Sequence, residues 1–382
     1  MVTLNSADSA LKSFYLDAIS ESLNMKVNPF LAKIEHTSDY VTGKEVRKAM
    51  RIGMNGGIGA GTETGDLPTA KGNTYLQLTT TLKNLYGTIE ISDKAIRASA
   101  NNEGAFVNLV NEEMQTLVES AKFNFGRMLF GDGTGKIGKI TDTDTPWIYV
   151  TNIQNFVVGM YVGVKEAPYE YQNRRVEEVN YEEGCIRLDL DPVNPDDIVG
   201  LYFHMYGSAD NELTGLGAIF SNAELYGLER MHHGMMPIIE KDFGDFSEEK
   251  VEKVIDTIEA KTGERVDYII CSWGVRRAIK EYYRAYDIPV KYIDIDGVKA
   301  IEFLGIPVVV DRFCPEGTMY LLTSKHFKLC QLCDWQWLEA EDGKILKQVP
   351  GKPVYTATLV KYADLICENP SAQGMLTGIT EV

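Results

Sequence analysis

The sequence NGGIGAG at residues 55–61 separates two segments rich in strand-forming residues, 44–54 and 75–91. The whole connection, up to Gly72, is roughly 20 residues long, which is unusual for a hairpin inside a compact domain. The flanking segments are too apolar and too regular for a disordered stretch. We therefore predict a two-stranded arm over residues 40–92 that projects from its own domain. A ribbon of this kind is marginally stable alone, so we expect a partner surface to order it.

Composition and charge limit the possible partners. The chain has 382 residues, 44% of them hydrophobic, which is enough for one large core or several smaller ones. Its 55 acidic residues outnumber its 38 basic residues and give a net charge of −17. Proteins that bind duplex DNA or anionic membranes by charge need the opposite balance. We expect no membrane partner, no direct affinity for DNA and, without a signal-like N-terminus, synthesis in a cytoplasm.

The rest of the chain alternates between helical and strand-like patterns. Apolar residues at helical spacing predict helices over 6–26, 92–99 and about 103–130, the last ending at a glycine-rich turn. Between 139 and 207 short apolar runs alternate with turns, which is typical of a small inserted barrel or sandwich. Its many acids fit a solvated outer face. From residue 214 the pattern is mixed, so the predicted class is α+β with an inserted all-β domain.

Cysteine usage favours free thiols. A long cytosolic chain does not need disulfides, and most of the cysteines lie in apolar, strand-like surroundings. Cys330 and Cys333 have the spacing of metal ligands, but no second pair completes a four-ligand zinc site. We therefore interpret both as structural. The six cysteines are Cys185, Cys271, Cys314, Cys330, Cys333 and Cys367.

Three further patterns resemble ligand-binding motifs and fail on spacing. GDGTGK at 131–136 lacks the second glycine and the Ser or Thr of a phosphate-binding loop, and it follows a helix rather than a strand. GAG at 59–61 with Gly65 has one residue too many for a dinucleotide fingerprint. The pair His232–His233 has no supporting acidic motif. We predict no catalytic, cofactor-binding or metal site, and no enzymatic activity.

The order of these elements resembles that of the major capsid proteins of tailed phages, which have the HK97-like capsid fold. The resemblance spans almost the whole chain and rests on a series of phrases in the family's order rather than on any single motif. These phrases are FGDG (130–133), ELTGLGAIF (212–220), YGLER (226–230), IICSWGVRR (269–277), FLGIPVVVD (303–311), GTMYLL (317–322) and DWQW (334–337).

The resemblance implies a division of the chain into five parts. They are an N-terminal arm (1–39), an extended β-hairpin loop (40–92), a peripheral domain with a long spine helix (93–138 and 346–382), the inserted β domain (139–210) and an axial domain (211–345). The inserted domain departs from the minimal family pattern, and we expect it to face outward.

The function implied is that of a major capsid protein. Such a protein self-assembles into hexamers and pentamers of an icosahedral head that encloses double-stranded DNA without reading its sequence. The expected location is the virion, after assembly in the host cytoplasm, and the expected partners are further copies of the chain, a portal protein and scaffolding proteins.

The extended loop is the expected assembly interface. Basic residues at its root would meet acids of neighbouring copies, and its glycines would let it take different angles in pentamers and hexamers. The candidate interface residues are Lys44, Arg47, Lys48, Arg51, Gly56, Gly57, Gly59, Gly61, Lys71 and Tyr75. Some members of the family cross-link lysines of this loop, and Lys71 and Lys83 lie in the corresponding region, but we assign no such bond.

Two alternatives stay open. An encapsulin-type nanocompartment shell protein shares the fold and differs in what it encloses. An α/β enzyme with a lid loop at 40–92 belongs to another class, and the lack of any convincing site disfavours it.

Overall fold

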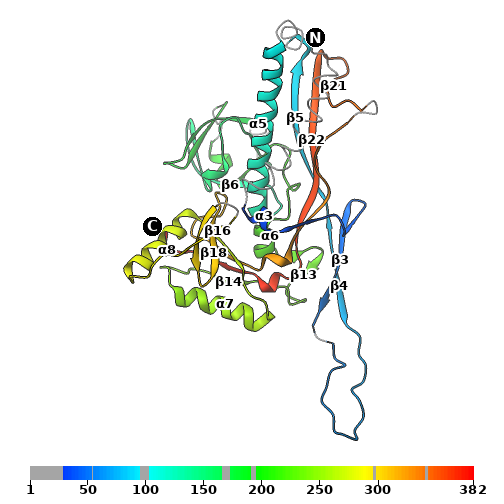
Figure 1. Cartoon of the computed structure of the whole chain (residues 1–382). Helices are drawn as coiled ribbons and strands as arrows, with labels where there is room; N and C mark the ends of the chain where they lie inside the picture. The colour runs from blue at the N-terminus through cyan, green and yellow to red at the C-terminus, as the bar shows by residue number, and fades with distance from the viewer. Residues whose placement is uncertain are drawn as a thin grey trace.

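The computed structural model describes most of the chain. The described residues are 29–53, 55–94, 103–165, 173–190, 195–295, 298–339 and 343–382. The expected helix at 6–26, most of the expected N-terminal arm and most of the expected helix at 92–99 lie outside these ranges. Figure 1 shows an elongated molecule in which a long helix and long strands run side by side, with a thin arm that leaves the body.

Strand β22 (Val354–Cys367) is the central strand of the first sheet. It pairs antiparallel with β5 (Lys83–Ser92) over ten residue pairs and with β20 (Phe327–Trp337). The short strands β1 (Glu35–Thr37) and β21 (Lys347–Gln348) complete this sheet beside β20 and β22. Helix α3 (Pro29–Lys33) precedes β1.

Helix α5 (Glu103–Phe130) covers one face of β5. It has the predicted bounds, and its buried side chains Met114, Val118, Phe125 and Leu129 share a core with the inward residues of β5. The approach is close at Gly87, where a Cβ atom would lie 2.9 Å from Leu117 Cδ1. A larger residue at this position would require the Leu117 side chain to move.

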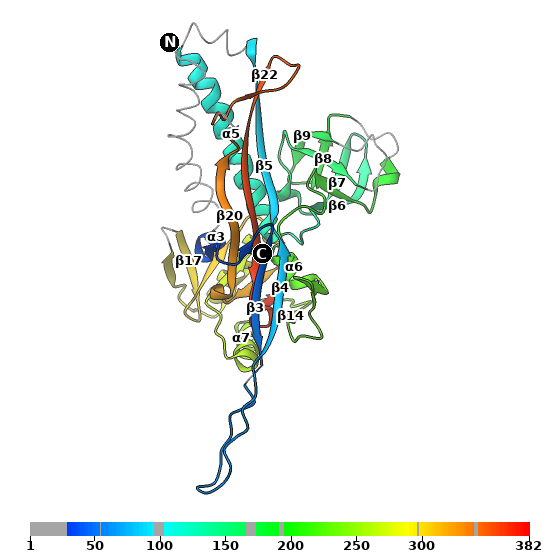
Figure 2. The same ribbon diagram turned by 90° about the vertical axis from the view of Figure 1, so that its right-hand side faces the viewer.

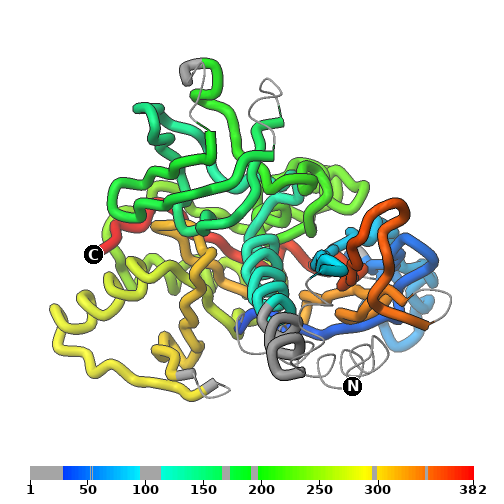
Figure 3. The backbone as a smooth tube through the Cα atoms, turned by 90° about the horizontal axis from the view of Figure 1, so that it is seen from above, coloured from blue at the N-terminus to red at the C-terminus, as the bar shows by residue number. Residues whose placement is uncertain are grey.

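A closed barrel follows α5, as the all-β prediction requires. Its strand order is β10-β7-β6-β11-β8-β9, and it has its own hydrophobic core around Phe156 and Phe203. In Figure 3, which looks along α5, the barrel and the pair β5–β22 lie on different sides of the helix. The strands are β6 (Lys136–Asp144), β7 (Trp147–Val150), β8 (Tyr161–Val164), β9 (Arg174–Asn180), β10 (Cys185–Leu188) and β11 (Tyr202–Met205), with short 3-10 turns at Ile153–Asn155 and Pro195–Ile198.

The third layer is a seven-stranded sheet in the order β14-β23-β19-β15-β18-β17-β16. Helices α7 (Glu248–Thr262) and α8 (Trp273–Ala285) pack on it through a shared core that includes Val251, Val275 and Ile269. The strands are β14 (Ile238–Glu240), β15 (Tyr268–Cys271), β16 (Tyr292–Ile295), β17 (Val298–Phe303), β18 (Ile306–Val310), β19 (Met319–Leu322) and β23 (Gly374–Leu376). The segment between barrel and sheet contains α6 (Leu216–Ser221) and the short pair β12 (Glu224–Leu225) and β13 (Leu228–Glu229).

Strand pairing corrects three sequence-based boundaries. The single strand expected at 75–91 is two strands, β4 (Thr74–Thr81) and β5, which pair with different partners. Strand β20 was expected in the axial domain but pairs with β22, and β23 was expected in the peripheral domain but lies between β14 and β19. The cause is the same in each case, because a strand's partner is fixed by contacts remote in sequence.

A buried ion pair joins the end of α5 to the chain that leaves the barrel. Arg127 donates to Glu212 through Nη1 (2.9 Å to Oε2) and Nη2 (2.5 Å to Oε1). Their side chains are 3% and 2% exposed. A two-bond contact of this geometry compensates for part of the desolvation of both charges, and loss of either partner leaves a buried charge unpaired.

We expect Glu212→Gln to lower the free energy of unfolding by about 3 kcal/mol, because it leaves the Arg127 charge buried without its counterion. The matched control is Glu259→Gln, since Glu259 pairs with Arg265 at 3.0 Å on the surface. The control should cost less than about 1 kcal/mol. Urea denaturation of both variants measures the difference, and equal costs would contradict the structural role assigned to the buried pair.

Candidate functional site

The arm, formed by strands β3 (Glu45–Ile52) and β4 and the tip between them, extends beyond the compact body of the subunit. Strand β3 pairs with β4 in eight residue pairs, from Glu45 opposite Thr81 to Ile52 opposite Thr74. The short strand β2 (Val41–Thr42) pairs with the first residues of β3. Figures 1 and 2 show the ribbon running along the body and then extending beyond it.

The root of the arm is embedded in the body. Val46 and Leu78 are fully buried and belong to the same core as α5 and β22. In an antiparallel ladder, directly opposite residues point to the same face, so Thr80 (opposite Val46) and Lys48 (opposite Leu78) also face the body. The projecting part therefore begins beyond this embedded segment.

The tip of the arm, residues 55–73, is narrow and has no strand pairing. Asn55 Nδ2 donates to Asn73 Oδ1 at 3.0 Å and joins its two limbs at the base. Gly57 lets the limbs approach, since a Cβ atom at this position would lie 3.3 Å from the backbone nitrogen of Lys71. This glycine thus serves close packing between the limbs as well as backbone freedom.

Two large apolar side chains project from the tip into solvent. Ile58 is 76% exposed and Leu67 is 90% exposed. Isolated exposed apolar residues are common, but two of them on a segment that stands off the body form a surface suited to contact with a partner. They were not among the sequence-based candidates, although their position in a glycine-rich loop was visible.

The basic candidates at the root differ in their contacts. Lys44 and Arg51 are exposed, and Arg47 pairs with Glu45 of its own strand at 2.7 Å. Lys48 is half-buried, contacts Glu368 and lies 4.1 Å from the centre of the Tyr40 ring. Lys48 thus has an acidic partner in its own chain, and its contact with a neighbouring copy stays a prediction.

The remaining candidates lie on the tip or at its base. All of them are exposed except Gly57, which is half-buried. Lys83, the second lysine considered for a cross-link, belongs to β5 and not to the arm. These candidates are Gly56, Gly57, Gly59, Gly61, Lys71 and Tyr75.

The patterns that resembled ligand-binding motifs have structural roles. Asp132 Oδ1 accepts from the backbone N–H of Thr134 at 3.0 Å, so GDGTGK forms a closed turn after α5. All six cysteines are free, five of them buried and Cys333 half-buried. His232 contacts Glu229 at 2.5 Å on the surface. Within the described ranges no group of three potential ligands could hold a metal ion, and no helix is long and apolar enough to span a membrane.

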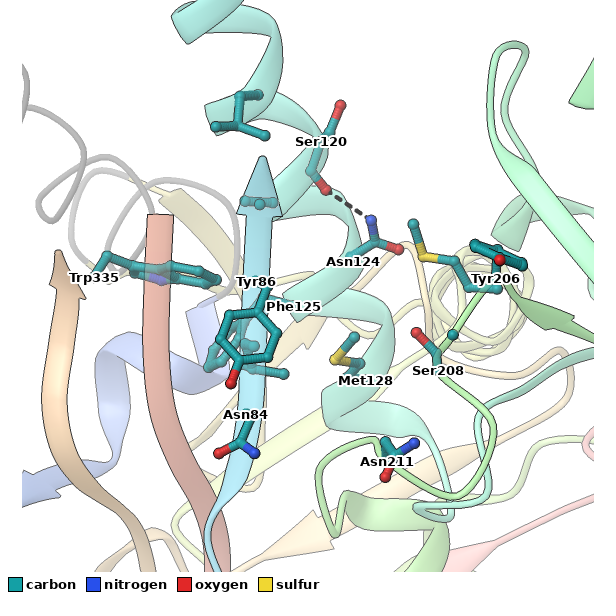
Figure 4. Close-up of a pocket in the computed structure, with 16 residues that line it drawn as sticks. Asn84, Tyr86, Ser120, Asn124, Phe125, Met128, Tyr206, Ser208, Asn211 and Trp335 are labelled. Carbon is teal, nitrogen blue, oxygen red and sulfur yellow. Dashed lines mark hydrogen bonds between the residues drawn. The ribbon is translucent and has the colours of Figure 1, made fainter. Parts of the chain in front are cut away.

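A cavity of about 400 Å³ lies between α5, β5 and residues 205–211. Figure 4 shows Tyr86, Trp335 and Phe125 on one side and Asn124 with Tyr206 on the other. None of its lining side chains is charged, and it holds no set of nucleophile, base and acid. A second cavity of about 660 Å³, between α5 and the barrel, shares Asn124 and Tyr206 with it.

Two buried carboxyl groups have raised pKa values for the same cause. Burial raises the pKa of Asp311 to about 6, and one hydrogen bond, from the Phe313 N–H at 2.9 Å, opposes the shift. Burial also raises the pKa of Asp364, opposed by hydrogen bonds from Thr80 and Thr214. Asp364 is fully buried in β22 beside the arm root, whereas Asp311 follows β18.

Asp311 should make stability depend on pH. Its pKa rises from 3.8 unfolded to about 6 folded, so the stability it contributes is fully present below pH 3.8 and is lost as the pH rises through 6. Asp311→Asn should therefore be about 3 kcal/mol more stable than wild type at pH 8. The advantage should disappear near pH 4. Urea midpoints at several pH values test this, with exposed Asp256→Asn as control, and parallel curves for wild type and Asp311→Asn would refute it.

Comparison with solved structures establishes the fold. The capsid asymmetric unit of cyanophage A-1(L) superposes with a TM-score of 0.58 at 11% identity, covering 92% of this chain and 93% of that one. The capsid of a native GTA particle gives 0.49 at 11% identity, covering 93% and 92%. The SrpI encapsulin of Synechococcus elongatus gives 0.45 at 10% identity, covering 93% and 89%.

No family model matches the sequence, and no curated protein matches it either. The structural match to the cyanophage capsid spans nearly the full length of both chains. The chain therefore has the fold of the shell-forming proteins, the HK97-like capsid fold, with a barrel inserted after the spine helix α5.

Proposed function

We propose that this protein is the major capsid protein of a tailed phage. The observation that carries the proposal is the arm: a ribbon anchored in the body that presents Ile58 and Leu67 to solvent on a narrow tip. The exposed tip has no supporting surface on its own subunit, and repeated copies of one chain provide such a surface in a closed shell.

The proposal assigns a role to each layer of the fold. The sheet around β22 with α5 is the peripheral domain, and the seven-stranded sheet is the axial domain that surrounds the five-fold and six-fold axes. The barrel faces outward. The shell is built from hexamers and pentamers, assembles in the host cytoplasm with portal and scaffolding proteins, and encloses double-stranded DNA. The net charge of −17 favours an inner surface along which DNA slides without sequence-specific contacts.

The proposed receiving surface for the arm lies along β5 of a second copy. Within the described part of the chain, β5 pairs along one edge only, with β22, and the uncharged cavity of Figure 4 runs along residues 84–87. Trp335 Nε1 and Asn124 Oδ1 line it without hydrogen-bond partners among the described residues. A peptide group supplies one acceptor and one donor, and residues 55–62 of a second copy are an uncharged segment.

The two alternatives differ in what they require. An encapsulin-type shell would use the same arm and the same contacts between copies, and would enclose protein cargo. An enzyme with a lid would need converging reactive groups near the arm, and the neighbouring cavity offers amides, hydroxyls and apolar side chains instead. The proposed role is structural and not enzymatic.

Removing the apolar side chains of the tip should lower the yield of shells and leave the subunit folded. In Ile58→Ser/Leu67→Ser, each contact loses about 2 kcal/mol of apolar burial, so we expect at least about a tenfold lower yield of shells. Negative-stain microscopy and sedimentation measure the yield. The matched control is Leu190→Ser/Val199→Ser, which removes exposed apolar surface from the barrel. Normal shells from the tip variant, or a monodisperse wild-type subunit under all conditions, would contradict the proposal.

Reversing two exposed charges at the root should weaken contacts between copies. Arg47→Glu/Arg51→Glu replaces two exposed cations that we propose meet acids of a neighbour. We expect fewer shells at low salt and partial recovery near 1 M salt, where exposed charges are screened. Light scattering during assembly follows this, and shells formed at the wild-type rate at low salt would show that these arginines have no such partners.

A further inference from the structure

Each strand of the arm is held at its root by a different carboxylate near the end of β22. Asp364 Oδ2 accepts a hydrogen bond from Thr80 Oγ1 of β4 at 2.7 Å. Four residues later, Glu368 accepts from Lys48 Nζ of β3. Because one contact holds each strand, the ribbon is restrained against tilting and against rotation about its own axis.

Apolar packing supports the same restraint. Val46 and Leu78, the cross-strand partners of Thr80 and Lys48, are fully buried in the main core. Two lysines contact the aromatic ring of Tyr40, with Lys48 Nζ 4.1 Å and Lys328 Nζ 5.5 Å from its centre. The root is thus fixed on its buried face, whereas the nearest neighbours of the tip glycines belong to the tip itself.

Asp364 also contacts a third part of the chain. Its Oδ1 accepts from the backbone N–H of Thr214 at 2.8 Å, and its Oδ2 accepts from Thr214 Oγ1 at 3.1 Å. The next residue, Gly215, lies so close to the last turn of α5 that a Cβ atom would be 2.4 Å from Met128 O. One buried carboxylate therefore connects the arm, the long strand and the end of the spine helix.

The four donors to Asp364 come from Thr80, Thr214 and the N–H of Leu365. They explain how an acid is tolerated at a fully buried position of an apolar strand. An apolar residue at 364 would remove the acceptor of the Thr80 and Thr214 donors and would make none of these connections. The acid is thus better explained by the geometry that it fixes than by stability alone.

We infer that Asp364 and Glu368 are positioning residues that set the direction in which the arm leaves the subunit. The ribbon is a stiff lever as far as about Ile52 and Thr74, and bending is confined to the tip beyond. The expected freedom of angle in the glycine-rich segment then applies to the tip and not to the root. The consequence for shells rests on the proposed function, whereas the stiffness of the root does not.

Hydrogen exchange of the free subunit tests the lever directly. Thr80→Val and Lys48→Met remove the donor on each strand with little change of shape, and each acid keeps another partner, Thr214 for Asp364 and Lys328 for Glu368. In the double variant we expect residues 45–52 and 74–81 to exchange at least about tenfold faster, with β15 and the tip unchanged. Wild type should show a slow root and a fast tip.

Two controls separate positioning from general destabilisation. Thr81→Val makes the same substitution at the next, exposed position of β4 and should leave exchange at the root unchanged. Thr80→Ser keeps the hydroxyl and should restore slow exchange. If the root exchanges at the wild-type rate in the double variant, the inference is wrong whatever shells are formed.

Microscopy then tests the consequence for assembly. Wild type and Thr81→Val should form shells of one size, and the double variant should form shells of mixed size or open sheets. Uniform shells from a double variant whose root exchanges faster would overturn the link between arm direction and shell geometry. Absence of shells from wild type would refute the proposed function and leave the exchange result as the test of the lever.

Discussion

The position of β22 is the constraint on which the other layers depend. The strand is hydrogen-bonded to β5 along one edge and to β20 along the other, so its backbone groups are satisfied and it cannot shift without breaking both ladders. Helix α5 packs on β5, the arm is attached through Asp364, and the chain beyond β22 continues into the seven-stranded sheet through β23. A change in the register of this one strand would move all three.

Residue patterns within each segment were enough to predict the long helix, the barrel and the arm. Helix α5 has the bounds expected from its apolar spacing, and the barrel occupies the segment in which short apolar runs alternate with turns. The arm was predicted from the glycines of NGGIGAG, which no compact hairpin requires. In each case the period or the turn residue lies within the element itself.

Partners remote in sequence were not predictable in the same way. The donors to Asp364 come from Thr80 and Thr214, 284 and 150 residues away, and β23 pairs with strands that no local pattern connects to it. The sequence did contain one unused signal, an acid inside the apolar run that forms β22. A buried acid requires donors, but the sequence does not say which. Likewise, Lys48 resembled the other basic residues of the root until its contact with Glu368 distinguished it.

The barrel enters and leaves the body at a single point. Asp210 N–H donates to Thr134 O at 2.9 Å, and a Cβ atom on Gly135 would lie 2.6 Å from Ser208 O. The ion pair of Arg127 and Glu212 joins the two sides of the body just outside this point, so the chain on either side of the barrel is connected without it. The insert therefore behaves as an exchangeable module: in evolution it can be gained, replaced or lost, and in engineering the same position can accept a foreign domain for display.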